Sequence, residues 1–273
     1  MDPLAPLITA LHSEGRLRVW SMIITVFGDL VQHRGGEIST ARLGRLLGRV
    51  GVEQGALRTA LSRLGRDGWV DSERSGRTSL YRLSAQGLNQ FAPATTRIYA
   101  APRAVPVQRW AIALRLGPLG KPEATLSPAD EVSGGADCLV AGALEQVSEA
   151  YRAALLSPAH RAALVGLAAD LQALAVPLPT ALDAAAARML LIHRWRRLVL
   201  RFPDIPADLM PDDAPLVDPR RAVADIYAQL VPATEDWLEG ESPGLPPMAS
   251  PITSAALRFA GVQSGVQSGV HRG

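Results

Sequence analysis

One face of a short predicted helix carries arginine, glutamine and hydroxyl side chains at a spacing suited to binding DNA. Leu57, Leu61 and Leu64 recur at i, i+4 and i+7, the pattern of a helix with one buried face. The opposite face holds the polar residues Gln54, Arg58, Thr59, Ser62, Arg63 and Arg66. Arginine can form two hydrogen bonds with guanine O6 and N7, and glutamine can do the same with adenine. These residue types therefore predict contact with base edges and phosphates.

The order of these side chains along the helix suggests how they divide the work. Gln54, Arg58 and Thr59 come early, where such helices enter the major groove, whereas Arg63 and Arg66 are better placed for phosphates. The alternative is a solvated helix face whose arginines only keep the protein soluble. For any single residue, the sequence leaves both interpretations open.

A predicted hairpin follows this helix directly. Gly68 can take the left-handed conformation that ends a helix, a strand starts at Trp69, and Ser75-Gly76 is a turn signal before a return strand that ends at Leu83. The candidate DNA ligands of the hairpin are Arg74, Arg77 and Thr78. A polar-faced helix followed by a short hairpin is typical of the winged helix-turn-helix, in which the helix lies in the major groove and the hairpin tip contacts the backbone or the minor groove.

The residues before this helix supply the remaining elements of such a domain. A helix with a broad apolar face is predicted from Leu17 until Gly35-Gly36, Ile38 fits a short strand, and residues 41–50 fit a second helix capped by Ser39 or Thr40. The second helix carries Arg42, Arg45 and Arg49, which either contact the DNA backbone or are merely solvated.

Charge is unevenly distributed along the 273 residues. The net charge is +2, but the first 103 residues hold 14 arginines and 8 acidic residues, a net charge of +6, which leaves −4 for the rest. A basic first third on a slightly acidic remainder suits a DNA-binding head on an effector or oligomerisation body. A genome whose composition favours arginine and alanine would give a similar bias. The charge distribution therefore supports DNA binding only together with the helix and hairpin motif.

Composition also predicts four parts and a cytoplasmic location. The longest apolar runs are too short to span a bilayer, no signal peptide is recognisable, and the single Cys138 precludes an internal disulfide framework. Prolines mark a boundary after the head, Trp110–Leu116 and two later pieces fit strands, and helical periodicity resumes from Leu144. We expect a winged head over residues 1–91 with a loose lead-in at 1–14, a linker and shortened middle segment over 92–143, a helical effector and dimerisation domain over 144–240, and a flexible tail over 241–273.

The sequence resembles the PaaX family of bacterial transcriptional repressors, known for regulating phenylacetate catabolism. The resemblance is strongest over residues 19–83, in Phe27-Gly28-Asp29, in the run ALRTALSRLGRDGWV and in GRTSLYRLSAQG. A second match, LLIHRWRRLVLRFPDIPADLMP, covers residues 190–211. Relatives usually carry a ferredoxin-like middle domain similar to the Cas2 nuclease fold. Here the helix expected after its first strand is missing.

This resemblance implies a fold class and a function. We expect a mainly α fold with small β elements (α+β), in which a winged helix-turn-helix is followed by a short, degenerate Cas2-like, ferredoxin-like segment and a C-terminal helical domain. The implied function is a homodimeric repressor that binds operator DNA of an aromatic acid catabolic operon and is released by an acyl-coenzyme A (acyl-CoA), with phenylacetyl-CoA as the leading candidate. An effector-insensitive, architectural DNA-binding protein is the alternative.

A group of side chains in the second matched segment is the candidate effector site. It consists of His193, Arg194, Trp195 and Arg197. Arginines suit the phosphates of coenzyme A through paired hydrogen bonds, and a tryptophan suits an aromatic acyl group. The alternative is an amphipathic helix with a buried tryptophan and a surface cluster of arginines.

Enzyme classes find little support in the residues. The chain has no phosphate-cradling glycine-rich loop, no histidines at metal-ligand spacing and no serine in a nucleophile elbow. We therefore expect no catalytic residue, no metal site and no cofactor. An enzyme whose winged head mediates protein contacts is the remaining interpretation of this class.

Overall fold

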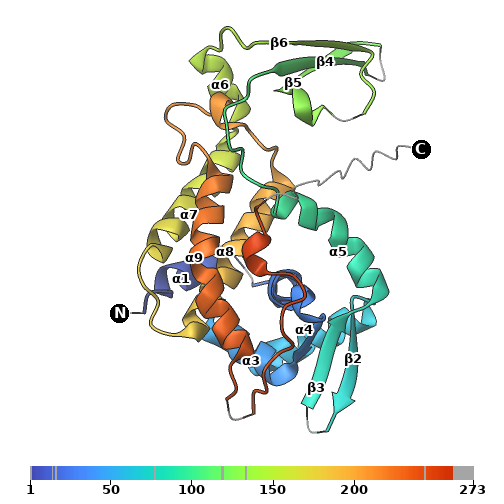
Figure 1. The fold of residues 1–273 in the computed structure, drawn as a ribbon, viewed down its shortest axis with the longest axis vertical. Helices are drawn as coiled ribbons and strands as arrows, with labels where there is room; N and C mark the ends of the chain where they lie inside the picture. Colours follow the sequence, from blue (N-terminus) through green and yellow to red (C-terminus); the bar gives the residue numbers. More distant parts are fainter. Residues whose placement is uncertain are drawn as a thin grey trace, which may run out of the picture. The chain divides into compact units, whose positions relative to one another are not determined.

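The computed structural model describes residues 2–13, 15, 17–76, 78–117, 120–132, 134–242 and 244–260. The chain divides into two compact units (Figure 1). The large unit contains residues 1–102, 165–203 and 219–273, and the small unit contains residues 103–164 and 204–218. Helices dominate and the strands form two small antiparallel sheets, which confirms the predicted fold class.

The large unit begins with a helix where the sequence predicted a loose lead-in. Helix α1 (Ala5–Ser13) buries Leu7 and Leu11, and Asp2 accepts a hydrogen bond from the Leu4 amide at its start. Two apolar side chains one turn apart are sufficient to dock this short helix on the unit. The prediction of a loose segment was therefore wrong for these residues.

The next helical segment changes from an α-helix to a π-helical turn that contains Gly28. Helix α2 (Val19–Val26) passes into a π-helical turn, η1 (Phe27–Val31), and then a short 3-10 turn, η2 (Gln32–Arg34). A Cβ atom at Gly28 would collide with the ring of Phe91. The glycine thus permits close packing at the turn that carries Asp29 into the interior.

Five short elements then follow in the predicted order. They are β1 (Glu37–Ser39), α3 (Thr40–Arg49), α4 (Gln54–Arg66), β2 (Val70–Ser75) and β3 (Thr78–Leu83). The sheet has the order β1-β3-β2 and is antiparallel throughout. Ser39 Oγ accepts a hydrogen bond from the Arg42 amide and caps α3, as predicted. Gly68, at φ 74°, ends α4 where the Trp69 amide donates to the Leu64 carbonyl.

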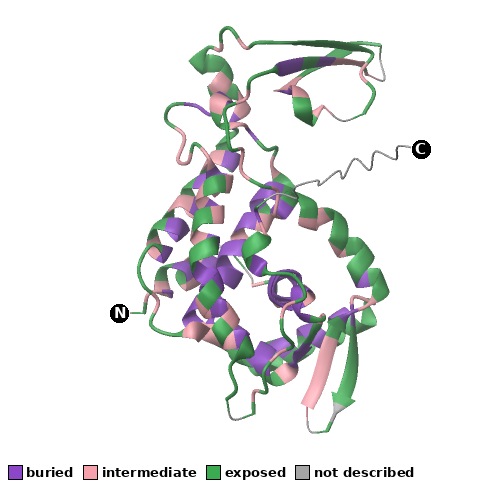
Figure 2. Cartoon of the chain, in the orientation of Figure 1, coloured by how far each residue is buried: buried purple, intermediate pink, exposed green. Residues whose placement is uncertain are grey.

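Further helical elements belong to the large unit. They are α5 (Ala85–Ile98), α7 (Pro158–Leu174, shared with the small unit), α8 (Ala181–Arg201), α9 (Pro219–Glu239) and the short η5 (Ala255–Leu257). Helix α8 contacts α2, α3, α5 and α9, and it is buried along much of its length (Figure 2). The consecutive small side chains of residues 184–187 allow this close approach.

The small unit contains the second sheet. Its elements are β4 (Trp110–Leu116), β5 (Pro122–Pro128), η3 (Ala129–Glu131), β6 (Cys138–Gly142), α6 (Glu149–Leu155) and η4 (Ala207–Leu209). The sheet is antiparallel with the order β5-β4-β6. The described residues between β4 and β5 include no helix.

The tail predicted from residue 241 is ordered over its first part. We call residues 244–260 the strap. The Ile252 amide donates to the His33 carbonyl at 2.7 Å, and Ala255 and Phe259 are buried in the large unit. The prediction of a flexible tail was wrong for the strap, because its contacts come from residues far away in sequence. The repeat at 261–270 lies outside the described residues.

No helix in the described part of the chain combines the length and the apolar character needed to cross a bilayer. Within the same residues, no group of three or more His, Cys, Asp or Glu side chains is arranged to hold a metal ion.

Candidate nucleic-acid interface and effector region

Helix α4 separates an apolar face from a polar face as its sequence predicts. Leu57, Leu61 and Leu64 are buried. The predicted DNA ligands on this helix are all exposed: Gln54, Arg58, Thr59, Ser62, Arg63 and Arg66. The structure therefore brings these side chains together on one accessible surface.

The polar side chains of α4 differ in how strongly the protein holds them. Arg58 makes no side-chain hydrogen bond or ion pair with the part of the chain that the structure describes. Thr59 Oγ1 donates to the Gly55 carbonyl at 3.0 Å. Arg63 and Arg66 lie 3.4 and 3.7 Å from the carboxylate of Asp67. Exposed pairs of this kind contribute roughly 0–1 kcal/mol, so both guanidinium groups can turn to phosphates.

Gln54 also has a structural role that the sequence did not reveal. A Cβ atom built on Gly44 of α3 would lie 2.7 Å from Gln54 Nε2. The Gln54 amide therefore covers the glycine at the junction of α3 and α4. A larger residue at position 44 would displace the end of the Gln54 side chain, so the contact helps to orient the first polar residue of α4.

The hairpin β2–β3 presents one of its predicted ligands fully. Arg74 is exposed and its Nε is 3.4 Å from the Gly76 carbonyl, whereas Thr78 is half-buried. Arg77 lies outside the described residues. Thr40 Oγ1 donates to the Ser79 carbonyl at 3.0 Å, so the start of α3 is tied to the hairpin.

The arginines of α3, for which the sequence left two interpretations open, separate into three environments. Arg42 is buried, with its guanidinium 5.0 Å from the Trp237 ring and hydrogen-bonded to the carbonyls of Trp237, Gly240, Leu245 and Pro246. Arg49 donates to Asp183 and Asp2, both at 2.6 Å. Arg45 is exposed. Of the three, Arg42 and Arg49 hold the head to other segments of the large unit.

A buried carboxylate lies at the centre of the large unit. Asp29 accepts hydrogen bonds from Arg188 Nε at 2.8 Å, Tyr99 Oη at 2.8 Å and Tyr227 Oη at 2.9 Å, and Arg258 Nη1 lies 3.3 Å away. Burial opposes the charged form, but the charges of Arg188 and Arg258 outweigh it and hold the pKa of Asp29 below its usual value. Asp29 is therefore a charged anchor for helices distant in sequence.

A second carboxylate extends this network. Arg188 Nη1 also donates to Glu235 at 2.8 Å, and Glu235 pairs with Arg34 and lies 3.5 Å from His33. Burial raises the pKa of Glu235, but hydrogen bonds from His33, Arg34 and Arg188 outweigh the effect of burial and bring the pKa down to about 2. Apart from the Gly-Asp pair in the matched motif, no pattern in the sequence indicates this network, because its members come from five separate segments.

An aromatic cluster lies beside Asp29. The ring of Phe259, in the strap, is 5.3 Å from the rings of both Tyr99 and Tyr227 in edge-to-face geometry. Tyr99 and Tyr227 are 6.2 Å apart. Burial, followed by the charge of Asp29, raises the pKa of each tyrosine. Both tyrosines are therefore neutral donors to the carboxylate.

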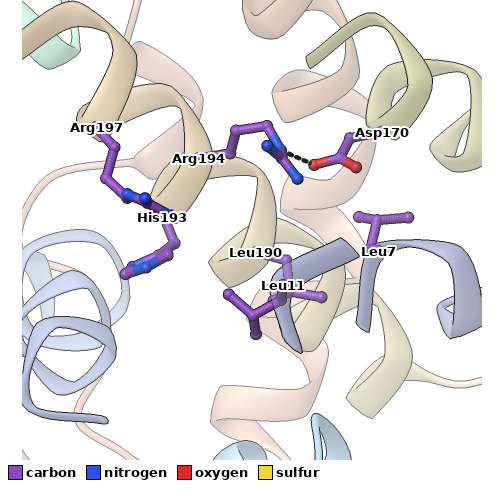
Figure 3. A pocket seen from close by; sticks show the side chains of 7 residues that line it. All are labelled: Leu7, Leu11, Asp170, Leu190, His193, Arg194 and Arg197. Atoms are coloured by element: carbon purple, nitrogen blue, oxygen red, sulfur yellow. Dashed lines mark hydrogen bonds and ion pairs between the residues drawn. The ribbon is translucent and has the colours of Figure 1, made fainter. Parts of the chain in front are cut away.

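Three of the predicted effector ligands line one small cavity with Leu7, Leu11, Asp170 and Leu190. They are His193, Arg194 and Arg197 (Figure 3). Arg194 extends to an ion pair with Asp170, and the His193 ring, with Nδ1 3.0 Å from Thr25 Oγ1, points away from it. The free volume is about 10 Å³, room for about one water molecule. Burial, aided by Arg196, Arg197 and Arg194, lowers the pKa of His193 to about 3, so this ring is neutral.

Trp195, the fourth predicted ligand, is not in this cavity. Its ring is buried, its Nε1 donates to the Ile98 carbonyl at 2.8 Å, and the guanidinium of Arg220 lies 5.3 Å from the ring. The four predicted side chains therefore do not form one site. In the described structure, Trp195 contributes to the packing of α8 against the end of α5.

Comparisons with known proteins match both halves of the chain. The sequence model of a family described as PaaX-like protein matches residues 18–87, and that of the PaaX-like protein C-terminal domain matches residues 143–240. The chain is 28% identical over 255 residues to the transcriptional repressor PaaX of Escherichia coli (strain K12), which covers 78% of this chain and 80% of the relative. This relative is, by its name, a transcriptional repressor. The two matches together span most of the elements of the large unit, and they show that the chain belongs to the PaaX-like family.

Proposed function

We propose that this protein is a DNA-binding transcriptional repressor that reads its operator with α4. The observation that carries the proposal is the exposed polar face of α4 beside the exposed hairpin β2–β3. In a winged helix-turn-helix, such a helix enters the major groove and the hairpin contacts the backbone or the minor groove. The named relative is a transcriptional repressor, which supports the same conclusion.

Within this surface, we assign each side chain a role from its exposure and from the bonds that it makes within the protein. Arg58 has no partner among the described residues, so it can bind a guanine edge without breaking an internal bond. Gln54 and Thr59 flank it at the start of α4, while Arg63, Arg66 and Arg74 are exposed cations suited to phosphates. The protein would act as a homodimer whose two heads bind half-sites about 34–36 Å apart, or a multiple of this distance.

The proposal extends to the signal that relieves repression. We assign the controlled genes to an aromatic acid catabolic operon of the phenylacetate type, and the effector to an acyl-CoA such as phenylacetyl-CoA. To release DNA, the effector must bind more tightly to a head arrangement that does not fit the operator. The hydrogen bonds of Arg42 to distant carbonyls and the ion pair of Arg49 with Asp183 support this, since they connect α3 to the body of the large unit.

One observation favours a second function. The cavity beside His193, Arg194 and Arg197 is too small for any part of coenzyme A, and Arg194 is already paired there. An effector-insensitive DNA-binding protein with an architectural role would have no need of a larger site. The two functions differ in whether a ligand changes DNA affinity.

The test is binding to the DNA upstream of the protein's own gene and its neighbours, at physiological salt with competitor DNA, with and without phenylacetyl-CoA. Specific binding that phenylacetyl-CoA releases supports the repressor and its effector class together. Specific binding that ignores phenylacetyl-CoA and other acyl-CoA compounds supports the architectural function. Absence of specific binding would remove the role assigned to α4.

A further inference from the structure

The ring of Phe259 occupies a site built by other segments of the protein. Tyr99 and Tyr227 hold it edge-to-face, each with its ring centre 5.3 Å away, and only 7% of Phe259 is exposed. Edge-to-face packing of this kind is favourable for any phenyl group of the same size. We call Tyr99 and Tyr227, whose hydroxyls bond to Asp29, the aromatic cage.

The strap holds Phe259 in the cage by a few separate contacts. Arg258 donates to the Gly28 carbonyl at 3.0 Å and lies 3.3 Å from Asp29, while its guanidinium is 4.3 Å from the Tyr99 ring. Further along, the Ile252 amide bonds to His33, and Arg34 donates to the Ala249 carbonyl at 3.0 Å. These contacts are few and each joins one residue of the strap to the elements beneath it, so the strap can detach without unfolding those helices.

Other parts of the strap are exposed or adjoin open space. Ile252 and Leu257 are 79% and 63% exposed. A hollow of about 430 Å³ lies between residues 246–249 and the β1–β3 surface. Phe259 itself has a φ of 63°, a left-handed conformation that is unfavourable for a residue with a Cβ atom. Release of the strap would relieve this strain.

We propose that the aromatic cage is the receptor for the aryl group of an acyl-thioester effector, which binds by displacing Phe259. The inference rests on the proposed function, since it takes the acyl-CoA class from there. The Phe259 side chain is a benzyl group, and a phenylacetyl thioester carries the same benzyl group on its carbonyl carbon. The strap is thus a built-in competitor for the ligand.

The charge beside the cage accounts for selection between a thioester and the free acid. Asp29 remains paired with Arg188 after Arg258 leaves, and its carboxylate faces the cage through the tyrosine hydroxyls. A second carboxylate, as in phenylacetate, would be repelled at this buried position. A neutral thioester carbonyl avoids this repulsion, so the cage favours the activated acid over the free one.

The strap also connects the cage to the DNA-binding head. At its other end, the carbonyls of Leu245 and Pro246 accept hydrogen bonds from Arg42 on α3. Helix α3 packs against α4. When Phe259 leaves the cage and the strap detaches, Arg42 loses these acceptors, and the support of α3 changes. An aryl ligand would in this way alter the position of the helix that reads DNA.

The test uses the full chain and three measurements. Phenylacetyl-CoA is titrated by calorimetry into the wild type, Phe259→Ala and the matched control Leu257→Ala, which removes an exposed apolar side chain from the same segment. Hydrogen exchange of residues 246–260 is followed with phenylacetyl-CoA, phenylacetate or coenzyme A alone. Operator release is recorded in parallel. A chain ending at Ser254 serves as the second variant if Phe259→Ala misfolds.

The expected result is that phenylacetyl-CoA speeds exchange in the strap and that phenylacetate does not. Phe259→Ala should bind phenylacetyl-CoA at least about tenfold more tightly, because the cage is already vacant, and Leu257→Ala should bind as the wild type does. Unchanged affinity of Phe259→Ala, or a strap that is protected when ligand is bound, overturns the cage. If phenylacetyl-CoA still releases the operator in that case, the proposed function is retained and only the cage is rejected. If no variant binds phenylacetyl-CoA, the cage and the effector assignment both fall, while operator binding without ligand still decides the DNA-binding function.

Discussion

Arg188 Nε donates to Asp29 Oδ2 at 2.8 Å, and neither side chain is exposed to solvent. The pair joins the π-helical turn after α2 to the centre of α8, which are 159 residues apart in the chain. A buried charge is tolerated only when it is paired and hydrogen-bonded. The pair therefore fixes how the head and the C-terminal helices of the large unit pack together.

The first prediction concerns this pair. Asp29→Asn keeps the shape of the side chain but leaves Arg188 and Arg258 without their shared negative charge. We expect the free energy of unfolding to fall by about 3–5 kcal/mol, the usual effect of breaking a buried ion pair. Urea unfolding followed by circular dichroism measures it. Asp213→Asn, which removes an exposed partner of Arg161, is the matched control and should cost no more than about 1 kcal/mol. Equal effects of the two substitutions would contradict the assigned role of Asp29.

The second prediction concerns pH. Because folding lowers the pKa of His193 from 6.5 to about 3, the unfolded chain binds a proton between these values that the folded chain does not. The stability from this group is complete above pH 6.5 and decreases as the pH falls toward 3. We expect a loss of about 2–3 kcal/mol between pH 6.5 and 4.5. In His193→Gln, which can still hydrogen-bond to Thr25, this part of the pH dependence should be absent. Parallel pH profiles for the wild type and the variant would show that His193 is not the group responsible.

The elements of the head were predictable because their signals are local. The leucine spacing of α4, the Ser39 cap and the turn at Gly68 each depend on residues within one or two turns. The pairing that keeps Asp29 charged and the carbonyl groups that bind Arg42 were not predictable. Arg42 finds its acceptors 195 to 204 residues further along the chain, and no local pattern specifies such a contact.

The effector site shows a different limit of sequence reasoning. His193, Arg194, Trp195 and Arg197 are neighbours in sequence, and all four lie on α8. Residues one or two positions apart on a helix point in different directions, however. His193 thus lies in the cavity near α1 while Trp195 packs against the end of α5. Adjacency in sequence therefore does not place Trp195 in the cavity that the other three side chains line.

The third prediction tests the close approach at Gly28. Gly28→Ala places a methyl group against the Phe91 ring, and we expect a loss of about 1–3 kcal/mol of stability from overpacking. The matched control is Gly48→Ala in α3, where a Cβ atom meets nothing within 4 Å. There the better helix propensity of alanine should stabilise the protein by about 0.5–1 kcal/mol. Thermal and urea unfolding give both values, and a smaller loss from Gly28→Ala in a Phe91→Ala background would assign the strain to that ring.

The last prediction separates base reading from phosphate binding on α4. Arg58 has no partner among the described residues, so Arg58→Ala should leave the fold intact and weaken specific operator binding by about 1–3 kcal/mol, with little change in binding to random DNA. Arg63→Ala should weaken both kinds of binding alike and reduce the slope of log affinity against log salt by about 1. Arg109→Ala, which alters an exposed arginine of the small unit, is the control and should change neither kind of binding.

The three variants are compared by fluorescence anisotropy at several salt concentrations. Operator affinity that is unchanged in Arg58→Ala would exclude Arg58 from the interface. A uniform loss in Arg58→Ala would reassign it to phosphate binding, because a side chain that reads bases must discriminate between sequences.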